Sequence, residues 1–395
     1  MFHVAGTNGK GSTCAYLRGA IEAAGLTAHV YSSPHLVRFN ERIRIAGTLI
    51  DDALLANLLG EVLDVAEGLK ASFFEVTTAA AFLAFARISA DACIIEVGLG
   101  GRLDATNIIS RPTVCGIASL GIDHEAFLLA PEDDVPETPL DRIAFEKAGI
   151  AKRGVPLVTQ AYAPSMRAEI AKQAAKVGAT LFDRRRDWDA AIDGERLRYH
   201  DSRGALDLPL PRMTGAHQAD NAALAIAMLR HQAAIALPSD AFAKGVESTS
   251  WPARLQRLRA GPLSRLLPKA RALWLDGGHN PDAGIALAKA LADRPPLHIV
   301  CGLLRNKDAL GFLRPFADRI ASFQAVPIPG HEHHAPTELC QRVQSQLGIA
   351  DAEPCNDVEA ALAVVCNRRP AGDVLICGSL YLAGEVLRAN GELPD

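Results

Sequence analysis

The chain lacks long apolar runs, paired cysteines and a strong charge of either sign. Although 49% of its 395 residues are hydrophobic, the longest apolar candidate, Ala79–Ala86, is much shorter than a membrane span. The formal net charge of -4 offers no basic surface for nucleic acid, and no basic, then apolar, secretory start is present. The eight cysteines form no C-x-x-C pair, which excludes a disulfide framework and a cysteine zinc site. These absences predict a cytoplasmic protein with neither nucleic acid nor a membrane as partner.

The most informative stretch that is present lies at residues 4–13, which read VAGTNGKGST. An apolar run ends at Gly6, and an amphipathic helical pattern follows the glycines. This order favours phosphate binding, because backbone N–H groups, a lysine and the helix dipole meet at one point. The pattern departs from the usual phosphate loop: Gly11 separates the lysine from the hydroxyl residue, and Val4 stands in place of the first glycine. Alone, the stretch would favour an ordinary glycine-rich turn.

The rest of the chain alternates strand and helix patterns, interrupted once by a basic, proline-containing connector at residues 248–261. The alternation predicts a mostly parallel, P-loop NTPase-like α/β sheet domain over residues 1–253 and a smaller Rossmann-like α/β domain over residues 254–395. Residues 127–139 are rich in proline and acids and are predicted to form an exposed insertion. Two α/β domains in series predict a ligand cleft between them, at the carboxyl ends of the strands.

Polar residues after the predicted strands are the candidates for chemistry. Glu96 ends an apolar strand, where a metal ligand and a solvent-facing strand end are equally good explanations. Asp123 and His124 follow the next strand, so the same sheet edge is predicted to place them beside Glu96, which favours a metal site. Lys147 lies on the helix after that loop and is, by spacing alone, a solvated lysine.

The second domain begins with a similar cluster. Asp276 ends its first strand, and His279 and Asn280 follow before a helix that starts with proline. These residues are predicted to face a nucleotide across the cleft. Arg254, in the connector, is predicted to reach a phosphate with its planar guanidinium, and a solvated linker charge is the alternative.

Motifs along almost the whole chain resemble the folylpolyglutamate synthase/dihydrofolate synthase family, within the Mur-ligase superfamily. In chain order they are AGTNGKGST, YSSPHLVRFNERI, SFFEVTTAAAF, EVGLGGRLDATN, GIDHE, EKAGIAK, GAHQADNAALA, W-x-x-R-x-Q, LDGGHNP and GSLYLAGEV. The Gly-Lys-Gly-Ser order is this family's form of the phosphate loop. The resemblance is to the bacterial bifunctional type.

The resemblance implies an ATP- and Mg²⁺-dependent ligase acting on small molecules. One activity joins dihydropteroate to L-glutamate, and the other extends reduced folates through γ-glutamyl links. In both, the substrate carboxylate attacks the ATP γ-phosphate, and the glutamate amine then displaces phosphate from the acyl phosphate. The protein's part is to position the reactants and neutralise charge.

The resemblance also implies residue roles. It assigns ATP contacts to Asn8, Gly9, Lys10, Gly11, Ser12, Asn221, Arg254, Asp276 and His279. It assigns metal ligands to Ser12, Ser33, Glu96 and His124, and catalytic roles to Lys10, His124 and Lys147. The family carbamylates the lysine that matches Lys147, which would reverse the interpretation of that residue as solvated. Pterin contacts are implied at Ser72, Phe73, Phe74, Glu75, Leu103, Asp104 and Ala105.

Two departures from the family pattern accompany these expectations. The helical segment that members carry before the loop strand is expected to be absent, which would affect part of the folate pocket. The insertion at residues 127–139 lies where the family link is shorter and is expected to reshape the region beside the metal site. We expect a monomer. The alternatives are a Mur-type ligase acting on a UDP-linked substrate, a P-loop kinase, and a non-catalytic nucleotide-binding module.

Overall fold

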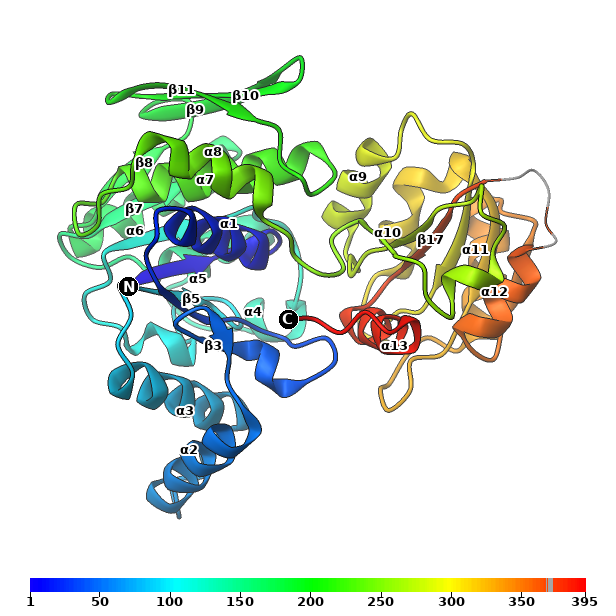
Figure 1. Cartoon of the computed structure of the whole chain (residues 1–395), viewed down its shortest axis with the longest axis horizontal. Coiled ribbons are helices and arrows are strands. Elements are labelled where there is room, and N and C mark those ends of the chain that lie inside the picture. The colour runs from blue at the N-terminus through cyan, green and yellow to red at the C-terminus, as the bar shows by residue number, and fades with distance from the viewer. Residues whose placement is uncertain (367, 369–371) are drawn as a thin grey trace.

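A computed structural model describes residues 1–366, 368 and 372–395. The chain forms two α/β lobes (Figure 1). The first lobe is built on an eight-stranded sheet in the order β4-β3-β2-β5-β1-β6-β7-β8. Six of these strands run parallel, and β3 and β4 are antiparallel at one edge. The strands are β1 (Phe2–Ala5), β2 (Ala28–Tyr31), β3 (Ile43–Ile45), β4 (Thr48–Leu49), β5 (Ala92–Glu96), β6 (Val114–Ile117), β7 (Pro156–Thr159) and β8 (Thr180–Asp183).

Helices cover both faces of this sheet, which explains why its central strands are almost entirely apolar. One face packs against α1 (Lys10–Ala23), α7 (Ala216–Arg230) and α8 (Ser239–Ser248). The other face packs against two helix pairs, α2 (Asp52–Val65) with α3 (Phe73–Arg87) and α5 (Pro139–Ala148) with α6 (Pro164–Val177). The short helix α4 (Glu125–Leu128) and the 3₁₀ turns η1 (Phe39–Arg42) and η2 (Ala105–Ile108) lie in loops.

A small antiparallel sheet lies over α7 and α8, at the top of Figure 1. Its strands are β9 (Trp188–Asp193), β10 (Arg196–Asp201) and β11 (Gly204–Pro209). Trp188, Leu197 and Tyr199 from these strands join the core that contains α7. The small sheet therefore extends the hydrophobic core of the first lobe on the side of α7 and α8.

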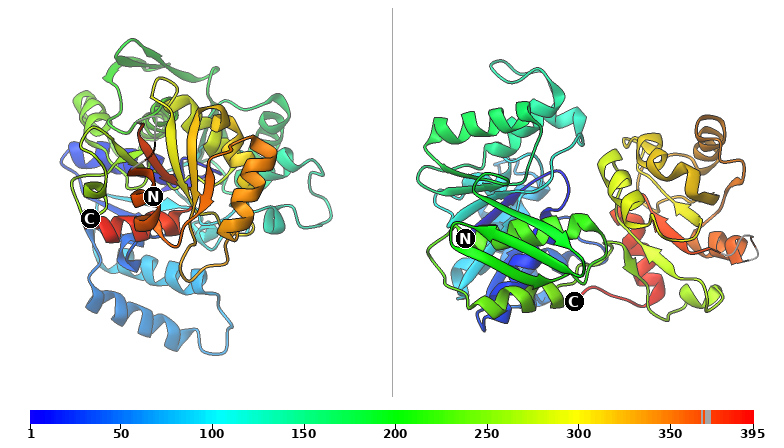
Figure 2. Two further views of the ribbon diagram at one scale, coloured as in Figure 1. Left: turned by 90° about the vertical axis from the view of Figure 1, so that its right-hand side faces the viewer. Right: turned by 90° about the horizontal axis from the view of Figure 1, so that it is seen from above.

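The second lobe contains a six-stranded sheet in the order β12-β13-β17-β14-β15-β16, parallel except for β12 (Figure 2). Its strands are β12 (Gln256–Arg257), β13 (Leu273–Leu275), β14 (Leu297–Cys301), β15 (Ile320–Ala325), β16 (Ala352–Pro354) and β17 (Val374–Cys377). One face packs on α9 (Pro281–Ala290), α10 (Ala309–Leu313) and α11 (Pro336–Leu347), and the other on α12 (Val358–Cys366) and α13 (Leu380–Asn390). The 3₁₀ turns η3 (Ser264–Leu266) and η4 (Arg314–Arg319) connect elements.

The predicted fold class is confirmed in both lobes. Between Leu128 and α5 the chain forms no helix or strand, and Glu132 pairs with Arg102 and Arg142 there. The region predicted as an insertion is therefore tied to the first lobe by ion pairs. All eight cysteines are free thiols, as the sequence indicated. Among the described residues, no helix combines the length and apolarity that a membrane crossing needs.

Candidate active site

The phosphate-loop stretch joins β1 to α1 in the middle of the first sheet. Gly9 precedes the helix with φ 82°, and a Cβ there would clash with the Asn221 side chain, so glycine is required. Lys10 Nζ donates to the Gly6 carbonyl at 3.0 Å and the Thr7 carbonyl at 3.4 Å. The loop therefore gathers a lysine, a helix N-terminus and Asn221 at one point, as a phosphate site requires.

Two buried oxygen groups beside this loop lack strong partners. The Ser12 hydroxyl is in a residue 1% exposed and has no hydrogen-bond partner among the described residues. Glu96 is 5% exposed and accepts a hydrogen bond from the Ser33 N–H at 3.2 Å. Burial raises the pKa of Glu96, and the positive charge of Lys10 and the Ser33 hydrogen bond oppose the shift. An unsatisfied hydroxyl and a buried carboxylate fit Mg²⁺, which prefers hard oxygen ligands.

The protein alone does not supply a complete metal shell at this edge. In the described ranges, no group of three His, Cys, Asp or Glu side chains lies close enough to hold an ion. Mg²⁺ at nucleotide sites commonly has one or two protein ligands and completes its shell with phosphate oxygens and water. The oxygen groups present here fit that pattern, and the four assigned ligands Ser12, Ser33, Glu96 and His124 stay predictions.

The loop after β6 carries Asp123 and His124 and lies across β1 from Glu96. Thr7 Oγ1 donates to the Gly121 carbonyl at 2.8 Å and so ties this loop to the phosphate loop. His124 has a left-handed backbone (φ 55°), which is uncommon outside glycine, and its N–H donates to the Asp123 carboxylate at 2.8 Å. The fold brings these polar side chains to the same sheet edge, with the phosphate loop between the acid and the histidine, and their meeting at one metal site stays a prediction.

Three side chains of the second lobe reach Asp123. Asn280 Nδ2 donates to its carboxylate at 3.1 Å, His279 Nε2 lies 3.3 Å from it, and Lys307 Nζ forms an ion pair with it. Burial acts to raise the pKa of Asp123, but the hydrogen bond from His279 and the charges of His279 and Lys307 outweigh it, and the pKa is lowered. Asn280 and Asn8 also exchange two amide hydrogen bonds of 3.1 Å each. The two lobes therefore contact each other directly at the phosphate loop.

The connector places Arg254 in the same cleft. The residues on either side of it, Ala253 (φ 54°) and Leu255 (φ 42°), have left-handed backbones, which are strained for residues other than glycine. Hydrogen bonds hold them: Leu255 N–H donates to the Asp276 carboxylate at 2.7 Å, and the Gly277 N–H donates to the Ala253 carbonyl at 3.0 Å. Asp276 thus fixes the connector as well as ending β13.

Lys147 is buried, so the interpretation of a solvated helix lysine is wrong. The residue is 4% exposed, and among the described residues its Nζ donates one hydrogen bond, a long one of 3.4 Å to the Gly100 carbonyl. Burial, followed by the charge of Lys10, lowers the pKa of Lys147 to about 7. A large fraction of this amine is therefore uncharged near neutral pH, which is the form that reacts with electrophiles.

The stretches with implied pterin contacts lie on the opposite face of the first sheet from α1. Ser72 and Glu75 form a capping box that begins α3, and the Asp104 carboxylate accepts from the Leu99 and Thr106 N–H groups. Phe74 packs beside Tyr31, with ring centroids 6.0 Å apart, and Ala105 begins η2. Two apolar side chains stay open to solvent: Phe73 is 65% exposed and Leu103 is 78% exposed.

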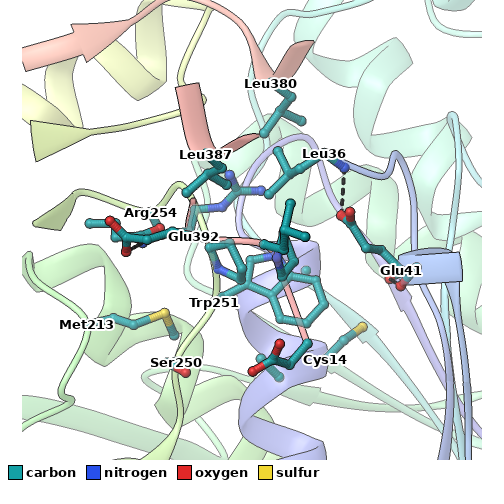
Figure 3. Close-up of a pocket in the computed structure, with 18 of the residues that line it drawn as sticks. Cys14, Leu36, Glu41, Met213, Ser250, Trp251, Arg254, Leu380, Leu387 and Glu392 are labelled. Atoms are coloured by element: carbon teal, nitrogen blue, oxygen red, sulfur yellow. Dashed lines mark hydrogen bonds between the residues drawn. The ribbon is translucent and has the colours of Figure 1, made fainter. Parts of the chain in front are cut away.

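A cavity of about 480 Å³ opens between the lobes (Figure 3). Gly11, Ser33 and Glu96 line it from the first lobe, and Trp251 and Arg254 line it from the connector. A Cβ on Gly11 would lie 3.0 Å from Trp251 Nε1 and 3.6 Å from Glu96 Oε2, so the loop, indole and carboxylate are in close contact. The cleft predicted between two α/β domains is therefore present.

Sequence reasoning missed three residues. Trp251 was not predicted to line the cavity, Lys307 was not predicted to contact Asp123, and Arg42, whose guanidinium stacks on Phe39 and Phe73, was not predicted beside the pterin stretches. Lys307 follows β14 as Asp276 follows β13, so the strand-end rule applied to every strand would have found it. Arg42 shows no such signal.

Comparison with known proteins gives the same picture as the geometry. Residues 262–389 match the family model described as "Dihydrofolate synthetase, C-terminal domain". The chain is 33% identical to the folylpolyglutamate synthase of Lacticaseibacillus casei, over 97% of this chain and 88% of the relative. Escherichia coli FolC in complex with DHPP and ADP matches with a TM-score of 0.84 at 30% identity, over 98% of this chain and 87% of that one.

A third match carries a nucleotide analogue and a metal. It is the bifunctional folylpolyglutamate synthase/dihydrofolate synthase from Yersinia pestis complexed with AMPPNP and Mn ion, with a TM-score of 0.83 at 32% identity, over 98% of this chain and 88% of that one. The sequence identity and the share of this chain covered are close to those of the Lacticaseibacillus casei and Escherichia coli proteins. On the shared phosphate loop, interlobe cleft and motif order, this chain belongs to the folylpolyglutamate synthase/dihydrofolate synthase family of ATP-dependent ligases.

Proposed function

We propose that this protein joins L-glutamate to dihydropteroate, to reduced folates, or to both, at the expense of ATP. The observation that carries the proposal is the unsatisfied Ser12 hydroxyl beside the buried Glu96 carboxylate, next to Lys10, in a cleft between two lobes. This arrangement suits a nucleotide triphosphate with a divalent ion. The family relationship supports glutamate and a folate precursor as the other substrates.

In the proposed reaction, the substrate carboxylate attacks the ATP γ-phosphate and ADP leaves. The glutamate amine then attacks the acyl carbon, phosphate leaves, and an amide forms. Lys10 and the N–H groups of residues 9–12 neutralise phosphate charge, and Asn8, Asn221, Arg254, Asp276 and His279 surround the nucleotide. Ser12, Ser33, Glu96 and His124 would hold Mg²⁺, which supplies charge neutralisation when bound.

Lys147 is proposed to be carbamylated. Its burial and its pKa of about 7 support the proposal, because an uncharged amine reacts with carbon dioxide and a protonated one does not. The modification would replace a buried amine with an anion close to Lys10. Carbamylated Lys147 then acts with Lys10 and His124 as the catalytic set.

The pterin ring is proposed to bind at Ser72–Glu75 and Leu103–Ala105. Phe73 and Leu103 support this role because their exposed apolar side chains are free to contact a flat ring. Phe73 contacts Phe39 edge to face, with centroids 5.9 Å apart, which provides an aromatic platform for a flat ring.

We further propose a domain boundary at residues 253 and 254, a monomer as the active species, and a cytoplasmic location. The boundary is supported by β12, which begins at Gln256 and already belongs to the second sheet. The location is supported by eight free thiols.

Phosphate release measured with dihydropteroate, a reduced folate and glutamate varied separately tests the proposed function. We expect release only when ATP, glutamate and one of the two acceptors are all present. Release with a UDP-linked acceptor alone would assign the chain to another Mur-type ligase. Phosphate release without glutamate would indicate an ATPase. ADP formation without phosphate release would indicate a kinase, and ATP binding without ADP formation would indicate a non-catalytic module.

A further inference from the structure

Among the described residues, Asp123 is the one first-lobe side chain that contacts three side chains of the second lobe. Its donors come from two separate loops, Asn280 and His279 after β13 and Lys307 after β14. Asp123 is 9% exposed and Lys307 has a side chain 8% exposed, so the ion pair is screened from water. Contacts of this kind fix orientation strongly, because removing one partner leaves a buried charge unpaired.

The Asp123 carboxylate lies at the loops after β13 and β14, where an open α/β sheet commonly binds an anionic ligand. Strands β13 and β14 flank β17, and their following helices, α9 and α10, lie on the same face. The loops at the carboxyl ends of such strands form the usual anion-binding crevice of an open α/β sheet. Here a carboxylate of the neighbouring lobe fills that crevice. The second lobe thus binds the first through a side chain placed where a small anion would bind.

The two loops that bind Asp123 are themselves braced. Asn280 Oδ1 accepts from Asn8 Nδ2 and from the Ala283 N–H at the start of α9. His334 Nε2 donates to the Lys307 carbonyl at 2.9 Å, which holds the loop after β14 from behind. The donors therefore face Asp123 from rigid positions.

The first-lobe side of the contact is equally fixed to the phosphate loop. Thr7 N–H donates to the Ser119 carbonyl at 2.7 Å, and Thr7 Oγ1 and the Gly121 N–H are 3.1 Å apart. A displacement of Asp123 would therefore also displace the phosphate loop, through the hydrogen bonds of Thr7.

We propose that Asp123 is a positioning residue that clasps the second lobe onto the phosphate loop through His279, Asn280 and Lys307, so that the two-lobed nucleotide site is assembled before nucleotide binds. The clasp brings the Lys307 ammonium and the Asn8–Asn280 amide pair to the mouth of the loop. Loss of the clasp lets the lobes separate, and nucleotide affinity falls because binding must then drive closure.

Three variants and one control test the clasp in the full chain. Asp123→Asn removes the charge at constant size, and Lys307→Met removes its ionic partner. Asn280→Ser keeps an oxygen to cap α9 and loses the amide that reaches Asp123 and Asn8, and it serves if either charge variant fails to fold. Lys244→Met removes an exposed ion pair with Asp240 on α8, far from the cleft, and is the matched control.

Small-angle X-ray scattering of the ligand-free variants is the first readout. We expect a larger radius of gyration for Asp123→Asn, Lys307→Met and Asn280→Ser, and no change for Lys244→Met, with thermal unfolding of each lobe preserved. An unchanged radius of gyration in all three cleft variants overturns the proposal. This readout needs no nucleotide, so it decides the clasp even if the proposed function fails.

Calorimetric titration with AMPPNP is the second readout, and it rests on the proposed nucleotide site. We expect Asp123→Asn and Lys307→Met each to raise the Kd by about fivefold or more, and the double variant to be little weaker than the worse single one, because the two side chains act through one contact. Single effects that simply multiply in the double variant overturn the clasp. A wild-type chain that fails to bind AMPPNP contradicts the proposed function, and scattering then decides the clasp alone.

Discussion

The carboxyl edges of the two sheets differ in how their polar groups are satisfied. In the first lobe, the Ser12 hydroxyl is unpartnered among the described residues, and Glu96 has a single hydrogen bond. In the second lobe, Asp276 accepts two backbone N–H groups, and the Asn280 amide is fully engaged. Buried groups without partners are costly unless a ligand completes them. The first edge is therefore built to hold a ligand, whereas the polar groups of the second edge are satisfied by the protein, Asp276 by N–H groups of its own lobe and Asn280 by the first lobe.

The largest expected effect is at Lys10, which faces the ligand side of this comparison. Lys10→Ala removes the charge that neutralises the triphosphate, so kcat/KM for ATP should fall by about a hundredfold or more. Steady-state phosphate release measures the loss, and Lys244→Met provides the control. Activity within about tenfold of wild type would break the assignment of the first edge as the triphosphate site.

Glu96→Gln tests the same edge with opposite effects on activity and stability. The Mg²⁺ concentration needed for half-maximal activity should rise by about tenfold to a hundredfold. Because burial raises the pKa of Glu96, its ionised form destabilises the metal-free fold once the pH exceeds that pKa. The variant should therefore unfold at higher urea concentration than wild type at neutral pH without metal. A less stable variant would show that Glu96 is a structural group.

Lys147→Met tests the buried lysine through pH. The pKa of Lys147 is about 7 in the folded chain and about 10.5 when unfolded, so the unfolded state holds one more proton between these values. Stability should rise with pH in that window, by up to about 1.4 kcal/mol per pH unit, and the rise should vanish in the variant. Urea unfolding in carbonate-free buffer at several pH values measures it.

The same variant tests carbamylation. Activity should be lost in Lys147→Met and in Lys147→Ala, and short carboxylates should restore part of it in the alanine variant, because they refill the vacated space with a negative charge. Full activity without any additive would contradict a catalytic role for this residue.

Phe73→Ala tests the proposed pterin site, which lies outside the carboxyl edges of both sheets. The KM for dihydropteroate should rise by about tenfold because an aromatic platform is lost. The free energy of unfolding should change by less than about 0.5 kcal/mol, because Phe73 is mostly exposed. Leu69→Ala, which changes another exposed side chain, in the loop between α2 and α3, is the control and should leave the KM unchanged. Equal effects of both variants would remove the support for a pterin site.

The smallest effect is expected in the connector. Ala253→Gly removes backbone strain at φ 54° but adds flexibility to the unfolded chain and removes a buried methyl group, effects of about 1 kcal/mol each, so a small net loss is expected. Thermal unfolding should shift by only a few degrees, about 3 °C or less. A loss well beyond that would mean that the left-handed conformation is unstrained, and that the connector is held by other contacts.

Local patterns in the sequence predicted the fold well where the physical cause is local. The alanine-rich apolar run at residues 73–87 predicts a helix and forms α3, since Ser72, just before it, and Glu75 cap the helix and its apolar side chains face the core. By contrast, α8 was not predicted, because Gly245 lies in its middle and lowers helix propensity. That glycine is needed where α8 crosses α1, since a Cβ there would press on the backbone of Ala20.

The sequence could identify individual residues of the site, but it could not predict which residues contact one another in the fold. Strand-end position alone indicated Glu96, Asp123 and Asp276, which the fold does bring to the carboxyl edges. The partners of Asp123 come from 156 to 184 residues away, and no local pattern encodes such pairs. The burial of Lys147 depends on the packing of α5 against the loop after β5, which also lies beyond local sequence.

The central claim is that the chain activates a carboxylate with ATP at the edge that contains Lys10, Ser12 and Glu96. Dihydropteroate labelled with ¹⁸O in its carboxylate tests this claim most directly, with mass spectrometry of the phosphate released during glutamate ligation. Formation and breakdown of an acyl phosphate predicts one ¹⁸O atom in each phosphate, because the carboxylate oxygen that attacks phosphorus leaves with it. Unlabelled phosphate, released while ligation proceeds, would contradict the account.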